Sequence, residues 1–170
     1  HAEQAREFAT FLVSQQQTSG EFVYFPPKIP GGKPKDDTSA YYPGEAVLGL
    51  VLWSALDSDP RWLQTAQRGA DWLIDVRDAG KGPSSLENDH WLMIALHRLY
   101  VATRDERYED HALRLAAAVR HQQDKQVWHQ KFHRDYRGGY YEPPRATPAS
   151  TRAEGLAAVL DLLAEEGTSD

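Results

Sequence analysis

The sequence contains no cysteine. Disulfide bonds, thiol catalysis and cysteine-ligated zinc sites are therefore excluded. The compartment stays open between the cytoplasm and the periplasm or the extracellular space, because cysteine-free chains occur in all of them. The sequence also lacks any apolar run that approaches the ~20 residues of a membrane-spanning helix. We therefore expect no membrane span.

Nucleotide-binding motifs and excess positive charge are absent as well. Neither a Gly-x-Gly-x-x-Gly pattern nor a P-loop occurs, so we expect no nucleotide cofactor. The 19 Lys and Arg residues stand against 25 Asp and Glu residues, which gives a net charge of −6. This sign disfavours nucleic acid and anionic membranes as partners, because both bind positively charged surfaces. A hydrophobic fraction of 41% over 170 residues suits one globular domain.

An internal repeat organises the chain. The segments Leu48-Gly49-Leu50 and Asp59-Pro60-Arg61-Trp62 recur 46 residues later as Ile94-Ala95-Leu96 and Asp105-Glu106-Arg107-Tyr108. A pair of alanines four residues apart follows each Asp-x-Arg motif and also stands near the N-terminus. These pairs are Ala5 and Ala9, Ala66 and Ala70, and Ala112 and Ala116. The repeat therefore alternates two kinds of segment.

Both kinds of segment have helical periodicity. Residues 46–56 are almost entirely apolar, which is typical of a helix buried on all sides. Residues 60–77 instead carry one apolar stripe, which is typical of an amphipathic helix. We predict six helices, at 2–17, 43–57, 60–77, 87–103, 106–124 and 149–165. The expected fold is all-α, with about three helical pairs in two layers: buried inner helices covered by amphipathic outer ones.

Two connections are much longer than the turns between paired helices. Residues 18–42 and 125–148 are rich in proline and glycine. Long loops in compact domains are often functional. The runs Glu21–Phe25 and Val127–Phe132 are predicted to form short strands over one end of the helices.

This layout resembles the α/α toroids, the six-hairpin glycosidase-like superfamily that includes N-acylglucosamine 2-epimerases and unsaturated-uronyl hydrolases. Three segments at the starts of the expected inner helices carry the resemblance. They are Tyr41-Tyr42-Pro43-Gly44-Glu45-Ala46, Asn88-Asp89-His90-Trp91 and Ser150-Thr151-Arg152-Ala153-Glu154-Gly155-Leu156. In those families, acidic, histidine, arginine and aromatic residues at inner-helix ends line the sugar site. A closed toroid holds about six helical pairs, whereas this chain holds about three. We therefore expect that the chain is part of a longer protein, pairs with itself or forms a short open solenoid.

The resemblance implies a catalytic group at these helix starts. Glu45, Asp89 and Glu154 are the candidate acids, because two carboxylates beside a sugar act as acid and base or as acid and nucleophile. His90 is the candidate proton shuttle. The alternative is structural: acidic residues in a first turn oppose the helix dipole, and Thr151-x-x-Glu154 has the pattern of a capping box.

The resemblance also implies a substrate-binding set. Its members are Tyr41, Tyr42, Trp91, Trp128, Tyr140, Tyr141 and Arg152. Aromatic faces stack on sugar rings, and Arg152 can hold a carboxylate through a bidentate fork. Residues 126–153 contain five basic residues against two acids, so this segment is +3 while the remaining chain is −9. That balance suits an anionic glycan and repels nucleic acid. The alternative is that these aromatics form a packed cover over the helix ends.

The remaining histidines carry weaker signals. His129 and His133 have metal-ligand spacing only in a helix, and the nearby Gly138-Gly139 favours a loop, so we predict no metal site. His97 and His111 fall inside expected helices, where packing or surface roles are more common.

Three functional hypotheses follow. The first is a carbohydrate-binding or carbohydrate-processing toroid segment, acting as a glycoside hydrolase or a sugar epimerase. The second is a non-catalytic helical-repeat module that binds a protein or forms a homo-oligomer, which predicts exposed apolar area on the terminal helices. The third is a subdomain of a larger enzyme. Polar and aromatic residues at one end of the helices favour the first hypothesis.

Overall fold

The computed structural model describes residues 1–23, 41–125, 134–140 and 143–166. Within them the chain is helical, and no strand occurs. Six α-helices and two short helical turns follow one another in the order α1 (Ala2–Ser14), α2 (Tyr42–Ser54), α3 (Arg61–Trp72), the π-helix η1 (Leu73–Arg77), α4 (His90–Thr103), α5 (Glu106–Lys125), the 3₁₀-helix η2 (Arg134–Tyr136) and α7 (Ala146–Glu166). The predicted all-α class is confirmed, and each of the six expected helices is present.

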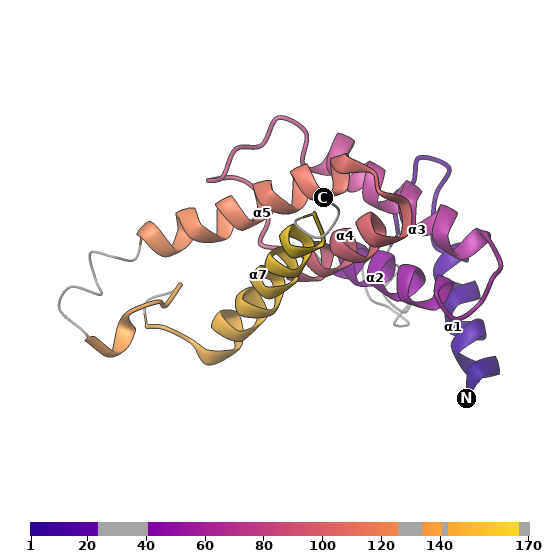
Figure 1. Cartoon of the computed structure of the whole chain (residues 1–170), viewed down its shortest axis with the longest axis horizontal. Coiled ribbons are helices and arrows are strands. Elements are labelled where there is room, and N and C mark those ends of the chain that lie inside the picture. Colours follow the sequence, from indigo (N-terminus) through magenta and orange to yellow (C-terminus); the bar gives the residue numbers. More distant parts are fainter. Residues whose placement is uncertain (24–40, 126–133, 141–142, 167–170) are drawn as a thin grey trace, which may run out of the picture.

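Helices α2, α4 and α7 pack in series, with α4 in the middle (Figure 1). Helix α3 packs on α2, and α5 packs on α4 and also contacts α7. Helix α1 packs on α2 and α3 at the end of the series that bears the N-terminus. This order places α4 in contact with helices from both halves of the chain.

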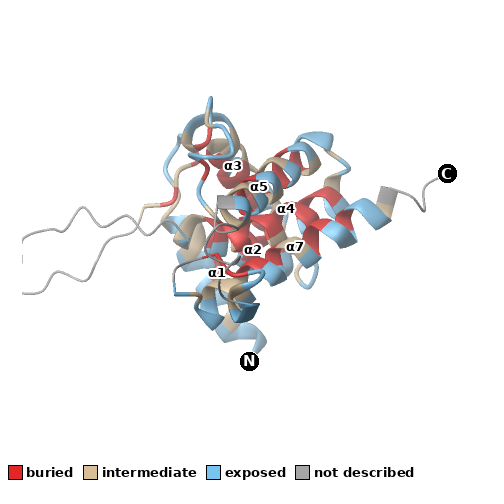
Figure 2. Cartoon of the chain, turned by 90° about the vertical axis from the view of Figure 1, so that its left-hand side faces the viewer, coloured by how far each residue is buried: buried red, intermediate tan, exposed pale blue. Residues whose placement is uncertain are grey.

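The core follows the hydrophobic pattern of the sequence. On α4, Leu92, Leu96 and Leu99 are fully buried, and on α3 the buried stripe includes Trp62 and Ala66. Figure 2 shows the buried residues concentrated on α2, α4 and the facing sides of their neighbours. Burial of one such large side chain stabilises the fold by about 1.5–3 kcal/mol relative to exposure.

The repeated Asp-x-Arg motif forms the same turn in both copies. Asp59 Oδ1 accepts a hydrogen bond from the backbone N–H of Arg61 at 3.0 Å. Asp105 Oδ1 accepts from the backbone N–H of Arg107, also at 3.0 Å. In each copy the arginine also forms an ion pair with its aspartate. The N-cap of α3 is Pro60, so Asp59 lies one residue before the cap and accepts from the first N–H of the helix.

The strand predicted at Glu21–Phe25 is wrong where the structure describes it. Residues 21–23 form only an isolated bridge, between Phe22 and Gln16. Phe22 is buried and packs against Gly69 of α3. The apolar pattern therefore reflects one anchoring side chain and not a pleated strand. The second predicted strand, Val127–Phe132, lies outside the described residues.

No helix in the described part of the chain is long and apolar enough to cross a membrane. This agrees with the expectation from the sequence. It follows from the interruption of every apolar stretch by charged residues within about 20 positions.

Candidate functional site

The first turns of α2 and α4 meet each other and the middle of α7 at two glycines. A Cβ atom on Gly44 of α2 would lie 2.5 Å from Asp89 Oδ1, and one on Gly155 of α7 would lie 3.1 Å from His90 Cβ. Both distances are below normal van der Waals contact. The absence of a side chain at Gly44 and Gly155 thus lets α2 and α7 approach the first turn of α4 from two sides.

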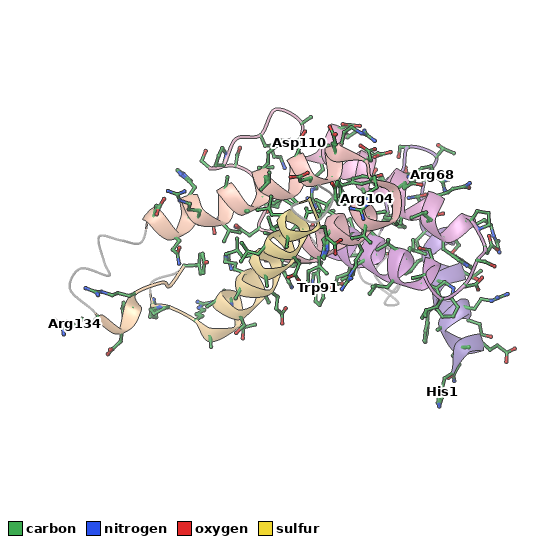
Figure 3. All side chains as sticks on the ribbon, in the orientation of Figure 1. His1, Arg68, Trp91, Arg104, Asp110 and Arg134 are labelled. Carbon is green, nitrogen blue, oxygen red and sulfur yellow. The ribbon has the colours of Figure 1, made fainter. Side chains whose placement is uncertain are left out.

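His90 occupies the centre of this meeting point. Its side chain is 7% exposed, and its Nε2 atom is buried without a hydrogen-bond partner among the described residues. The Tyr41 ring meets the imidazole edge-on at 6.1 Å between centroids, and the Trp91 ring lies at 4.5 Å. Figure 3 labels Trp91, which marks the start of α4 beside α7. His90 therefore has aromatic neighbours and one buried ring nitrogen without a protein partner among the described residues.

Two glutamates and an arginine act on His90 electrostatically. Burial lowers the pKa of His90. The negative charges of Glu154 and Glu45 partly raise it again, whereas the positive charge of Arg152 lowers it further. The lowered pKa makes a neutral imidazole at neutral pH, which can accept or donate a proton. Glu45 and Glu154 are exposed and belong to helices on opposite sides of α4. The structure thus brings three of the predicted site residues to one place.

The capping-box alternative for Glu154 is wrong. Helix α7 begins at Ala146, so Thr151 lies inside the helix and cannot be its N-cap. The Thr151 hydroxyl instead donates to the carbonyl of Pro148 at 3.2 Å. Glu154 is therefore free of a capping role, whereas Glu45 does lie in the first turn of α2 and opposes its dipole.

Asp89 is a buried structural anchor at the start of α4. It is fully buried and is the N-cap of the helix, with Oδ1 accepting from the backbone N–H of Leu92 at 3.0 Å. Its Oδ2 accepts from Arg77 Nη1 at 2.8 Å. Because both carboxylate oxygens are engaged, Asp89 fixes the helix start next to His90. A catalytic role for Asp89 stays a prediction.

Behind Asp89 lies a chain of charged groups that sequence reasoning missed. Arg77 also pairs with Asp78 at 2.8 Å, and His111 Nε2 lies 3.1 Å from the same Asp78 oxygen. Arg114 Nη1 lies 3.2 Å from His111 Nδ1. A guanidinium can only donate, so His111 Nδ1 accepts and Nε2 carries the proton that is donated to Asp78. The network joins η1, α4 and α5.

Two of the substrate-binding candidates, Arg152 and Tyr140, are buried and contact each other. Arg152 is buried, donates to the Pro148 carbonyl at 3.0 Å and to Gln122 Oε1 at 3.2 Å, and lies 4.9 Å over the Tyr140 ring. Tyr140 is also buried, as the packed-cover alternative predicted for it. A ligand carboxylate at Arg152 would therefore compete with the Gln122 amide.

The other aromatic candidates differ in exposure. Tyr41 is exposed, while Tyr42 and Trp91 are half-buried at the starts of α2 and α4. Burial raises the pKa of the Tyr42 hydroxyl. Trp128 and Tyr141 lie outside the described residues, as do His129 and His133. Among the residues that the structure describes, no group of three His, Asp or Glu side chains can hold a metal ion.

Comparison with known proteins adds no relative. No protein-family model matches the chain, and neither a curated protein nor a solved structure matches it.

Proposed function

We propose that this chain is a carbohydrate-binding or carbohydrate-processing segment of an α/α toroid, with its site where the starts of α2 and α4 meet the middle of α7. In this proposal α2, α4 and α7 form an inner layer and α3 and α5 an outer one. The burial of α4 between its neighbours and the one-sided burial of α3 support that assignment.

The observation that carries the proposal is the setting of His90. A buried imidazole with an unpartnered Nε2 lies under the electrostatic influence of Glu45 and Glu154, which come from helices on either side. A buried polar atom without a partner costs about 1–3 kcal/mol, so its retention is typical of a functional site. Neutral His90 suits proton transfer at a sugar carbon or oxygen, with a glutamate as the second acid or base.

Two reactions fit this set of groups. In glycoside hydrolysis, Glu45 and Glu154 would divide the roles of acid and base or of acid and nucleophile. In epimerisation, His90 would remove a proton from a sugar carbon and a second group would return one to the opposite face. The aromatic rings of Tyr41 and Trp91 offer stacking surfaces for a sugar ring in either case.

The test is thermal unfolding of the chain with neutral and uronic-acid oligosaccharides. A sugar present at about 100 times its Kd stabilises the fold by about 2.7 kcal/mol. For a chain of this size that is a rise in Tm of roughly 5–10 °C. The rise should be lost in Glu154→Gln. It should persist in Glu106→Gln, which changes an exposed glutamate in the first turn of α5. No shift with any sugar, or the same shift in Glu154→Gln, would contradict the proposal.

A second candidate function is a non-catalytic module that associates with a copy of itself or with another protein. The observation that favours it is the exposure of large apolar side chains on the terminal helices: Phe8 and Phe11 of α1 are 72% and 58% exposed, and Leu160 of α7 is 67% exposed. Exposed apolar patches often mark interaction surfaces.

Light scattering tests this second candidate function, because it measures the oligomeric state of the chain and of its variants. An oligomer that dissociates in Leu160→Glu, and not in Leu113→Glu on α5, would place the interface on α7. Leu113 is a suitable control because it is 39% exposed and lies outside the terminal helices. A monomer at every concentration would remove self-association and leave only a different partner.

A further inference from the structure

A second histidine on α4 repeats the setting of His90 two turns further on. His97 follows His90 by seven residues, which places both on one side of the helix at a separation of about 10.5 Å along its axis. His97 is 5% exposed, and its Nε2 atom is buried without a hydrogen-bond partner in the part of the chain that the structure describes. His111, which is also buried, has contacts at both ring nitrogens. Burial alone therefore does not explain the unpartnered atom of His97.

The repeat shows that the fold does not need a histidine at this position. The residue 46 positions earlier, on α2, is Val51, which is buried in the core. An aliphatic side chain therefore fills the equivalent place in the preceding repeat without an unpartnered polar atom. The imidazole of His97 costs stability that a valine or leucine would not, since a buried unpaired polar atom is unfavourable.

His97 lines a groove between α4 and α7. The groove is shallow and open to solvent, with a volume of about 410 Å³. In Figure 3 this part of α4 lies between the labels Trp91 and Arg104, with α7 alongside. The lining residues are His97 and Arg98 from α4, and Asp161, Ala164 and Glu165 from α7. Its volume is within the range of small-molecule sites, which begin at about 300 Å³.

The charges around the groove have two signs on two helices. Asp161 and Glu165 are four residues apart on α7, so their carboxylates share one side of that helix. Arg98 stands on α4. All three act on the ring: burial lowers the pKa of His97, Arg98 lowers it further, and Asp161 and Glu165 raise it.

We propose that this groove binds a small aminocarboxylate. Its ammonium group pairs with the carboxylate of Asp161, its carboxylate pairs with Arg98, and the Nε2 atom of His97 forms the hydrogen bond that it lacks within the protein. This site is separate from the proposed carbohydrate site and does not depend on it.

The test follows the ring nitrogens of His97 by ¹H–¹⁵N NMR during titration of the whole chain. The probes are glycine, γ-aminobutyrate and ε-aminocaproate, which differ in the separation of their two charges. Each is added to about 10 mM, which is enough to fill a site with a Kd of about 1 mM. At least one of them should shift the Nε2 signal of His97 and leave that of His111 in place. Butylamine and butyrate, which each lack one charge, should not.

Two variants separate binding from unspecific effects. Asp161→Asn and Arg98→Gln change exposed side chains and should each weaken the response at least tenfold while the chain stays folded. In His97→Leu, a stability gain together with loss of binding is expected. The proposal is overturned if none of the three amino acids shifts the His97 signal, if butylamine or butyrate shifts it equally, or if Asp161→Asn and Arg98→Gln respond like the wild type.

Discussion

Gly44 lies directly against the carboxylate of Asp89, so that a Cβ atom at position 44 would be 2.5 Å from Oδ1 and 2.8 Å from Oδ2. Asp89 in turn caps α4 and accepts from Arg77. The start of α2 is thereby packed against the group that fixes the start of α4. The position of His90 relative to Glu45 depends on this contact.

Gly44→Ala should destabilise the fold by about 1–3 kcal/mol, the usual cost of overpacking. The new methyl group would displace the Asp89 carboxylate or push α2 away from α4. Urea unfolding of the variant measures the change. Gly49→Ala is the matched control on the same helix, because its Cβ would meet only Leu12 Cδ1 at 3.6 Å, an ordinary contact.

Gly49→Ala should leave stability unchanged or raise it by up to about 1 kcal/mol, since alanine is the better helix former. Equal effects of the two substitutions would contradict the close packing of Gly44 on Asp89.

Asp89→Asn should lower the free energy of unfolding by about 3–5 kcal/mol, the usual cost of breaking a buried ion pair. The amide retains an oxygen for the backbone N–H of Leu92 but leaves the Arg77 guanidinium with one carboxylate fewer. Asp105→Asn provides the control, because it also replaces an aspartate that accepts from a backbone N–H at a helix start.

Asp105 is partly exposed, so its pairing with Arg107 contributes no more than about 1 kcal/mol. Chemical denaturation of Asp89→Asn and Asp105→Asn measures how much unfolding free energy each variant loses. A loss at Asp89 no greater than that at Asp105 would show that the buried pair does not stabilise the helix start.

The pH dependence of stability should carry the signature of Asp78. Burial raises its pKa, but His111 and the Arg77 guanidinium outweigh this and hold it well below the usual range. A lowered pKa in the folded state means that the stabilisation is complete above the unfolded-state pKa of about 3.9 and is lost as the pH falls below it. Unfolding midpoints should therefore drop steeply in this acidic range.

In Asp78→Asn the same acidic range should show a shallower slope, on a lower overall stability. Asp110→Asn, on the exposed side of α5, serves as the control and should keep the slope of the wild type. An unchanged slope in Asp78→Asn would mean that other carboxylates dominate the acid transition.

The helices were predictable because their signals are local. The apolar runs and the repeated Asp-x-Arg turns lie within a few residues of the structures that they form. The sequence predicts the last helix from residue 149, three residues after its actual start. Proline is tolerated in the first turn, where its missing N–H has no intrahelical partner, so α7 begins at Ala146.

Long-range contacts were harder to predict. The sequence predicts the grouping of Glu45, His90 and Glu154 from aligned helix starts, whereas the structure places Glu154 in the third turn of α7. The network of Arg77, Asp78 and His111 had no such signal. Its long-range contacts, Arg77 to Asp89 and His111 to Asp78, join residues separated by 12 and 33 positions. Nothing in the local sequence pattern distinguishes these residues from polar surface residues.

The electrostatic coupling at the candidate site can be measured without a substrate. Glu154→Gln removes the largest influence that raises the pKa of His90. The imidazolium then loses a nearby negative charge, so the pKa of His90 should fall further below its usual value. Glu45→Gln should shift it in the same direction by a smaller amount. Glu106→Gln, on the first turn of α5, should leave it unchanged. An NMR titration of the ring protons gives all three values. A His90 pKa that does not respond to Glu154→Gln would show that the two residues are not electrostatically coupled and would remove the main support for acid–base chemistry at this site.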